Sequence, residues 1–204
     1  MKKTLLSVIV LICSLTAVAQ VTIKPGVRGG INFARLTNTD LDTKTDFYFS
    51  AFGALKLSRF YTMQPEIGYS RQGAEGTMTY YDSFEDIYYT ENLNVKLEYV
   101  TLTFINKFTL TDSFNIHVGP TFDIGANTRS EYVDDIDLGI TAGIAYTLPF
   151  GLAVEARIKK GLVDVMDDYY YNDNDYYYGD DNVNSNIVFQ VGLSYSFDVT
   201  GTNK

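Results

Sequence analysis

The last apolar segment before the C-terminus most constrains how this chain can fold. Over residues 185–197, bulky apolar side chains alternate with small or polar ones. One alternate set ends in Tyr195 and Phe197, and the other contains Gly192 and Ser194. Because strand side chains point to opposite faces in turn, the pattern predicts a strand with one apolar face. A strand of this kind, ending in an aromatic residue, is what a membrane-spanning β-barrel needs to close against its first strand.

Seven earlier segments show the same alternation. The connections between them alternate long and short, as they do when every other turn lies on one side of a membrane. Pro65 interrupts the third segment and would normally place it at a sheet edge. The chain is therefore predicted to be all-β, an eight-stranded antiparallel up-and-down transmembrane β-barrel. The expected earlier strands are 24–36, 46–58, 61–73, 95–110, 114–125, 137–146 and 152–163, and the expected long connections are 37–45, 74–94, 126–135 and 164–184.

Alternation alone does not say which face points outward, but the size of the side chains does. The interior of an eight-stranded barrel is only just wide enough for side chains. Bulky apolar groups from every strand would overfill it, so they are predicted to face lipid. The alternative is a soluble, secreted, ligand-binding barrel with the two faces reversed. The small face supplies the glycines: Gly30, Gly68, Gly119, Gly139, Gly143 and Gly192.

The small face also carries charged side chains, which are predicted to lie inside the barrel and to pair there. An isolated charge away from water is costly, so burial requires pairing. We single out Glu66, Lys107, Glu155 and Arg157 as an interior charge network. Such a network can serve as an ion path, but in so narrow a barrel a plug of paired charges is favoured. The predicted interior charges are Arg28, Lys56, Glu66, Lys107, Asp123, Glu155, Arg157 and Lys159.

The N-terminus is predicted to be a signal peptide of residues 1–19, which leaves 20–204 as one barrel domain. Lys2 and Lys3 precede an apolar run over 5–15, and a small-residue site follows at 17–19. A lipoprotein signal at Cys13 is the alternative, but Ile12 stands where a small residue is expected. Cleavage removes two of the 16 basic residues and none of the 25 acidic ones, so the net charge becomes −11.

This acidity argues against nucleic acid as a partner, because phosphate binding needs a basic surface. The expected location is the outer membrane of a Gram-negative bacterium, reached by signal-peptide export. The expected partner there is outer-membrane lipid, and the protein is expected to be a monomer without a cofactor.

The connection over 167–181 is dense in Asp, Asn and Tyr. It does not match the spacing of a calcium-binding EF-hand loop, although its carboxylates make weak divalent-cation binding conceivable. Tyr offers a large amphipathic contact at low entropy cost, so this stretch is predicted to be a surface-contact loop. A structural or surface-interaction role through acidic, Tyr-rich outer loops is therefore the leading hypothesis. The candidate contact residues are Tyr169, Tyr170, Tyr171, Tyr176, Tyr177 and Tyr178.

His117 is the only histidine. A lipid-modifying barrel enzyme needs a histidine beside a nucleophile, so such an enzyme is the alternative function. No nucleophile-elbow motif, metal-ligand cluster or phosphate loop accompanies His117 in the sequence. The protein is expected not to be an enzyme.

Three segments resemble the PorT-like outer-membrane β-barrel family of Bacteroidota. They are residues 63–70 (Met-Gln-Pro-Glu-Ile-Gly-Tyr-Ser), residues 154–157 (Val-Glu-Ala-Arg) leading to Gly161 and Leu162, and the Phe-terminated last strand. The resemblance implies an exported, eight-stranded barrel of the OmpA or OmpX shape. Members commonly carry Tyr-x-Glu-x-Pro in the fourth strand; Tyr99 keeps the Tyr, whereas Thr101 and Thr103 replace the Glu and the Pro. The secretion role in the family name does not carry over to this chain on that resemblance.

Overall fold

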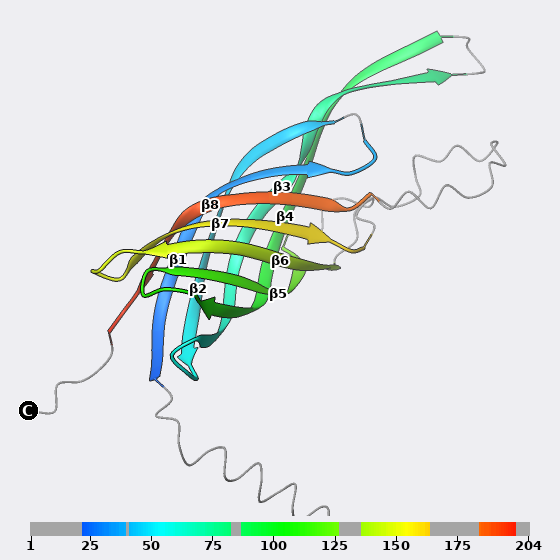
Figure 1. Cartoon of the computed structure of the whole chain (residues 1–204). Helices are drawn as coiled ribbons and strands as arrows, with labels where there is room; N and C mark the ends of the chain where they lie inside the picture. Colours follow the sequence, from blue (N-terminus) through cyan, green and yellow to red (C-terminus); the bar gives the residue numbers. More distant parts are fainter. Residues whose placement is uncertain (1–21, 40, 83–86, 127–135, 164–183, 199–204) are drawn as a thin grey trace, which may run out of the picture.

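The described residues of the computed structural model, 22–39, 41–82, 87–126, 136–163 and 184–198, form eight antiparallel strands. Each strand pairs with the next, and β1 pairs with β8, so the sheet closes into a barrel (Figure 1). The predicted fold class is confirmed. The strands are β1 (Thr22–Leu36), β2 (Asp42–Lys56), β3 (Tyr61–Asp82), β4 (Ile87–Thr109), β5 (Phe114–Gly125), β6 (Ile136–Thr147), β7 (Leu152–Gly161) and β8 (Asn186–Ser196).

The third and fourth strands are much longer than predicted. Residues 74–94 were expected to form a connection, but β3 and β4 stay paired from Ala74 opposite Val95 to Asp82 opposite Ile87. That expectation was wrong. We call the paired part beyond the barrel, residues 76–82 and 87–97, the outer hairpin. Figure 1 shows it projecting past every other strand.

The short and long connections lie at opposite ends of the barrel. The short ones span 57–60, 110–113 and 148–151. The beginning of β1 and the end of β8 lie at the same end as these turns (Figure 1). In outer-membrane barrels the short turns are periplasmic, so the outer hairpin belongs to the external end.

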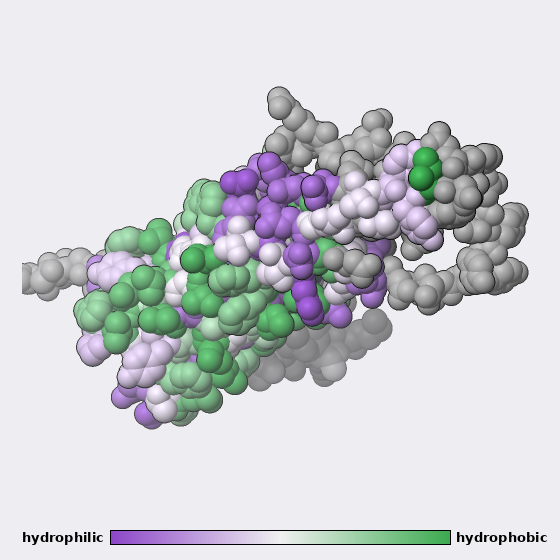
Figure 2. All heavy atoms as spheres, turned by 90° about the horizontal axis from the view of Figure 1, so that it is seen from above, coloured by the Kyte–Doolittle hydropathy of each residue, from purple (hydrophilic) through white to green (hydrophobic). Residues whose placement is uncertain are grey.

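The bulky apolar face points outward on all eight strands, as the packing argument predicted. Phe49 and Ile67 are each 56% exposed, and Leu193 is 50% exposed. Figure 2 shows apolar residues gathered over the barrel wall and hydrophilic ones toward the end that carries the outer hairpin. Soluble proteins do not expose so continuous an apolar surface, and this arrangement is opposite to the soluble-barrel alternative.

Two residues, Lys56 and Pro65, differ from the predicted pattern. Lys56 was expected inside but is exposed, because it lies at the last residue of β2, where the wall ends and its side chain reaches solvent. Pro65 lies in the middle of β3 rather than on an edge strand. The β2–β3 register has Phe52 opposite Glu66 and Leu55 opposite Met63, and it skips the position of Pro65. A gap in the backbone pairing with β2 suits proline, because proline has no backbone N–H to donate.

A small apolar cluster lies at the external end, where the ends of β1 and β2 meet β3 and β4. Leu36 and Leu97 are each 2% exposed, and Leu93 and Val95 pack against the cluster from the outer hairpin. We call this group the mouth cluster; it consists of Leu36, Leu41, Ala74, Leu97 and Tyr99. It attaches the root of the outer hairpin to the barrel.

No helix in the described part of the chain is long and apolar enough to cross a membrane.

Candidate functional site

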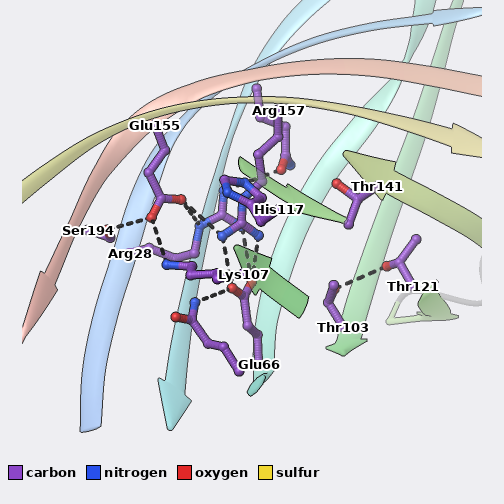
Figure 3. A network of polar contacts seen from close by, with 12 residues as sticks. Arg28, Glu66, Thr103, Lys107, His117, Thr121, Thr141, Glu155, Arg157 and Ser194 are labelled. Carbon is purple, nitrogen blue, oxygen red and sulfur yellow. Dashed lines mark hydrogen bonds and ion pairs between the residues drawn. The ribbon is translucent and has the colours of Figure 1, made fainter. Parts of the chain in front are cut away.

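Four charged side chains form a closed ring of ion pairs inside the barrel. Arg157 contacts Glu66 with Nη1 2.9 Å from Oε2, and Arg28 contacts the same oxygen at 3.2 Å. Glu155 completes the ring, with its Oε2 3.0 Å from Arg157 Nη2 and 3.3 Å from Arg28 Nε. Figure 3 shows the four side chains converging in the lumen, Arg28 from β1, Glu66 from β3, and Glu155 and Arg157 from β7. We call this group the ion ring.

Neighbouring polar groups hold the two carboxylates of the ion ring in place. Gln64 donates to Glu66 Oε1 at 2.6 Å. Ser194 donates to Glu155, and Lys107 Nζ lies 3.8 Å from Glu155 Oε1. The structure thus brings together the four residues that the sequence singled out, Glu66, Lys107, Glu155 and Arg157, and it adds Arg28.

A second cluster lies in the same interior, and it is acidic. Lys159 forms an ion pair with Asp123 Oδ2. Asp123 is directly opposite Asp137 across β5 and β6, and both carboxylates are buried. This described cluster therefore holds two carboxylates and one cation, Lys159, which is paired with Asp123. Oδ1 of each Asp has no hydrogen-bond partner among the described residues.

A chain of amides and hydroxyls links the two clusters. Arg28 contacts Gln190 Oε1 at 3.4 Å, and Gln190 donates to Asn32 at 2.8 Å. The chain continues from Asn32 through Ser70 to Gln72, which donates to Asp123 Oδ2 at 3.3 Å. Buried polar networks of this kind are stable only when their members find partners. Asn186 joins the chain by donating to Gln72.

The interior charges balance over the two clusters together. The cations are Arg28, Lys107, Arg157 and Lys159, and the carboxylates are Glu66, Asp123, Asp137 and Glu155. The ion ring with Lys107 has one positive charge in excess, and the second cluster has one negative charge in excess. Because the sum is zero, the barrel buries these groups without a net charge, which burial would penalise heavily.

Little free space remains among these side chains. A cavity of about 30 Å³ lies between the clusters, lined by Ser50, Thr101, Thr103, Thr121 and Thr141 among others. That volume has room for only about two water molecules. The part of the lumen between the two clusters is therefore largely filled with side chains, as expected for this number of strands.

His117 lies in the lumen beside Arg157 of the ion ring, at 2% exposure (Figure 3). Its Nδ1 is 3.3 Å from Asn115 Oδ1, and its Nε2 has no hydrogen-bond partner in the part of the chain that the structure describes. Gly143 makes room for it, because a Cβ at Gly143 would lie 2.7 Å from His117 Nε2. A histidine packed in this way faces the interior rather than lipid.

The outer hairpin is the second candidate site. A ladder of cross-strand hydrogen bonds runs along one face: Thr77 with Asn92 at 2.8 Å, Thr79 with Thr90 at 3.3 Å, and Asn94 with Glu75 at 3.4 Å. Tyr88 is 73% exposed. At the root, Lys44 donates to Asn94 Oδ1 at 2.7 Å and to the carbonyl oxygen of Val95 at 2.9 Å.

The candidate contact residues Tyr169, Tyr170, Tyr171, Tyr176, Tyr177 and Tyr178 lie outside the described residues. Within the described ranges, no group of three or more His, Cys, Asp or Glu side chains could hold a metal ion.

Sequence reasoning missed Asp137 and the amide chain through Gln72, Gln190 and Asn186. Their alternation places them inside, but which of them meet depends on how the strands are staggered around the barrel. The one available signal was Asp137 itself, a carboxylate on the small face of the sixth expected strand.

The chain has the features of an outer-membrane β-barrel protein. Its antiparallel sheet closes into a barrel, the outer wall is apolar, the interior charges are paired, and the short turns lie at one end. The comparison with family models agrees, because the model of the outer membrane protein beta-barrel domain matches residues 5–197. The chain belongs to this family, and its location is the outer membrane.

Several solved structures are similar in fold at low sequence identity. Neisserial surface protein A shares 11% identity, with a TM-score of 0.48, and the match covers 88% of this chain and 100% of that chain. The attachment invasion locus protein Ail of Yersinia pestis, in complex with the heparin analogue sucrose octasulfate, shares 10% identity, with a TM-score of 0.48 and coverage of 88% and 100%. OprG of Pseudomonas aeruginosa shares 12% identity, with a TM-score of 0.48 and coverage of 88% and 98%. No curated protein sequence matches the chain.

Proposed function

We propose that this protein is a non-enzymatic outer-membrane barrel that makes surface contacts through its external end. The observation that carries the proposal is the outer hairpin, which stands beyond the barrel wall with Tyr88 73% exposed. A paired and hydrogen-bonded structure outside the membrane is not needed to close the barrel. A role in surface contact accounts for this structure.

The filled lumen supports placing the function outside. The ion ring crosses the interior, and the cavity beside it has only about 30 Å³. A pore needs continuous space for a hydrated solute, and a plug of paired charges does not leave it. The mouth cluster adds buried apolar side chains at the external end, on the β1–β4 side of the barrel.

The position of His117 supports a non-enzymatic role. An enzyme acting on lipid needs its histidine where a lipid and a nucleophile meet. His117 is instead buried in the lumen next to the ion ring, whereas lipid covers the opposite face of the wall.

The finer parts of the proposal follow from the sequence. The protein is exported by a signal peptide over residues 1–19, acts as a monomer in lipid and is of the PorT-like type found in Bacteroidota. The acidic, Tyr-rich stretch over 167–181 shares the contact role with the outer hairpin, and weak divalent-cation binding there is an accessory property.

The test is attachment of intact cells. Full-length protein is expressed in a Gram-negative host, and its insertion is verified by a heat-dependent mobility shift on SDS gels. Cells are then measured for binding to immobilised mucin, collagen and fibronectin and to a lawn of a second bacterium. We expect binding above the level of cells with an empty vector.

Two variants locate the contact. One replaces residues 77–92 with Asn-Gly, which suits a tight hairpin turn, and the other deletes residues 167–181. Both should insert normally and show reduced attachment. Wild-type cells that attach no better than empty-vector cells, or a detectable lipid-modifying activity that is lost in His117→Ala, would overturn the proposal.

A further inference from the structure

The outer hairpin has an open strand edge along β4, and we propose that this edge binds an extended, basic peptide segment of a partner protein as an added β-strand. The inference rests on the proposed surface-contact function and names the site and the class of partner. The main observation behind it is the direction in which the backbone N–H and C=O groups of β4 point.

The direction follows from two hydrogen bonds at known positions. The amide of Thr109 donates to Phe60 on the β3 side, at 2.8 Å. The carbonyl of Glu98 accepts from Ala126 on the β5 side, at 2.7 Å. Backbone groups alternate along a strand, and the β3–β4 register runs without a shift to its end. The even-numbered residues of β4 therefore face away from β3: Thr90, Asn92, Asn94 and Lys96.

No described strand covers these residues. The pairing of β5 with β4 ends at Gly125 opposite Tyr99. Among the described residues, the backbone N–H and C=O groups of these four residues have no partner strand, and they lie along one edge of about the length of an average strand. Such an edge is a template for another strand, which is the basis of peptide recognition by β-strand addition.

The opposite edge of the outer hairpin is shorter and partly closed. Pairing of β2 with β3 reaches Asp42 opposite Glu75. A Cβ at Gly76 would lie only 3.2 Å from the backbone nitrogen of Asp42, so the β1–β2 connection lies against β3 there. Thr77 and Thr79 then begin the open part of the β3 edge. The β4 edge is therefore the better template.

The β4 edge is also held in shape before any partner arrives. Side-chain hydrogen bonds join Thr77 to Asn92 and Thr79 to Thr90, and Lys44 fixes Asn94 at the root. A template that is already ordered loses less entropy on binding. Natural edges are commonly protected by proline, and neither strand of the outer hairpin contains one.

Charge decides the class of partner. The stretch 74–98 contains one basic residue, Lys96, against six acidic ones. A basic extended segment complements the net negative charge of this stretch of sequence and is attracted to it at a distance. A second copy of the hairpin would bring like charges together, which disfavours self-pairing. The acidic residues are Glu75, Asp82, Glu85, Asp86, Glu91 and Glu98.

The experiment is a selection of random decapeptides displayed on phage against the full-length protein in lipid nanodiscs. Enriched peptides should be rich in Lys and Arg and free of internal proline. Each is then synthesised in two forms, with N-methyl groups on one or the other alternate set of amides. One form should lose binding and the other keep it, because only one edge of an added strand pairs with β4.

Two matched proline variants identify the edge. Thr90→Pro removes an outward amide from the β4 edge, and Thr79→Pro does the same on the β3 edge. Both lose the same Thr79–Thr90 side-chain contact and neither removes a rung between β3 and β4. Affinity for the selected peptides should fall on the order of tenfold in Thr90→Pro and stay near wild type in Thr79→Pro.

Several outcomes would overturn the inference: no enrichment over empty nanodiscs, enriched peptides without basic character, equal effects of the two N-methylated forms, or equal effects of the two proline variants. Self-association that depends on Thr90 would assign the edge to a second copy instead. If cell attachment is lost when residues 77–92 are replaced but is unchanged in Thr90→Pro, the surface-contact function stands and the edge inference falls.

Discussion

Arg157 on β7 and Glu66 on β3 form a two-point ion pair across the barrel interior, with Nη1 2.9 Å from Oε2 and Nη2 2.9 Å from Oε1. Their side chains are 1% and 3% exposed. The parallel two-point geometry fixes direction as well as distance. It ties β7 to β3, strands that are not neighbours in the sheet, and so braces the barrel across its lumen.

Arg157→Met should destabilise the barrel. The substitution leaves Glu66 and Glu155 buried with only Arg28 between them and Lys107 farther away, at 3.8 Å from Glu155. Removing one partner of a buried ion pair typically costs about 3–5 kcal/mol. The free energy of unfolding in urea, measured in lipid vesicles, is the readout.

Lys160→Met is the matched control for this prediction. Lys160 lies on the same strand but is exposed on the outer face. Its replacement should leave the free energy of unfolding unchanged or raise it. Equal losses for the two variants would show that the ion ring does not brace the barrel.

Gly192→Ala should also destabilise the barrel, because the interior has no room for a methyl group there. A Cβ at Gly192 would lie 2.2 Å from Tyr48 Oη and 2.3 Å from the carbonyl oxygen of Gly29. The backbone oxygen cannot move without shifting β1. Overpacking of this kind costs about 1–3 kcal/mol, and urea unfolding in vesicles measures it.

Gly53→Ala provides the comparison, since a Cβ at Gly53 meets nothing within 4 Å. Replacing a strand glycine where there is space should be neutral or favourable. If Gly53→Ala lowers the free energy of unfolding as much as Gly192→Ala does, the loss at Gly192 does not come from a lack of space in the lumen.

The alternation of side chains was enough to predict the barrel wall. In β8, Phe189, Leu193 and Tyr195 point outward and Gln190 and Ser194 point inward, as period two requires. The narrow interior then settled which face meets lipid, because glycines such as Gly192 lie where a Cβ would collide. These are local and steric facts that a single sequence contains.

The outer hairpin escaped prediction because the stretch is rich in Tyr, Asp and Glu, a composition that suggests a polar connection. Leu93, Val95 and Leu97 do alternate with polar residues, but the preceding stretch over 74–86 shows no clear apolar set to pair with them. Outside the membrane neither face has to be apolar. The cross-strand hydrogen bonds that hold the hairpin, such as Thr77 with Asn92, depend on a register that alternation does not reveal.

The polar chain between the clusters was missed for a different reason. Gln190 on β8 meets Asn32 on β1, and Gln72 on β3 meets Asp123 on β5. Contacts across a lumen follow from strand stagger and tilt, which the barrel as a whole determines. The sequence shows which side chains point inward but not which of them touch.

Lys159→Met should make stability strongly dependent on pH. Without Lys159, Asp123 and Asp137 lie opposite each other with no ion-pair partner among the described residues, although the amide of Gln72 donates to Asp123 and the backbone at Leu162 and Val163 donates to Asp137. The folded variant therefore binds protons more readily than its unfolded chain, so its stability falls as pH rises. The deficit relative to wild type should be larger at about pH 7.5 than at about pH 4.5.

Lys159→Met/Asp137→Asn tests the reason for that dependence. Removing one of the two facing carboxylates should recover part of the lost stability and flatten the pH profile. Urea unfolding at the two pH values measures both effects. A deficit that is independent of pH would mean that Lys159 contributes packing alone.

Lys44→Met should loosen the outer hairpin without weakening the barrel. Lys44 Nζ donates to Asn94 Oδ1 at 2.7 Å and to the carbonyl of Val95 at 2.9 Å, and these bonds fix the root of the hairpin to β2. Without them the hairpin should open locally more often, because local stability is not uniform across a structure. Chymotrypsin, which cleaves after aromatic residues, should cut at Tyr88 or Tyr89 several times faster.

Lys96→Met is the control for this variant, because Lys96 is exposed on the hairpin itself and makes the same change of charge. It should leave the cleavage rate near that of wild type, and neither variant should change the temperature at which the barrel unfolds on SDS gels. A faster cut in both would point to charge rather than to the bonds of Lys44. A lower unfolding temperature in Lys44→Met alone would show instead that the hairpin root and the barrel unfold as one unit. The outer hairpin would then contribute to the stability of the barrel and would not open independently of it.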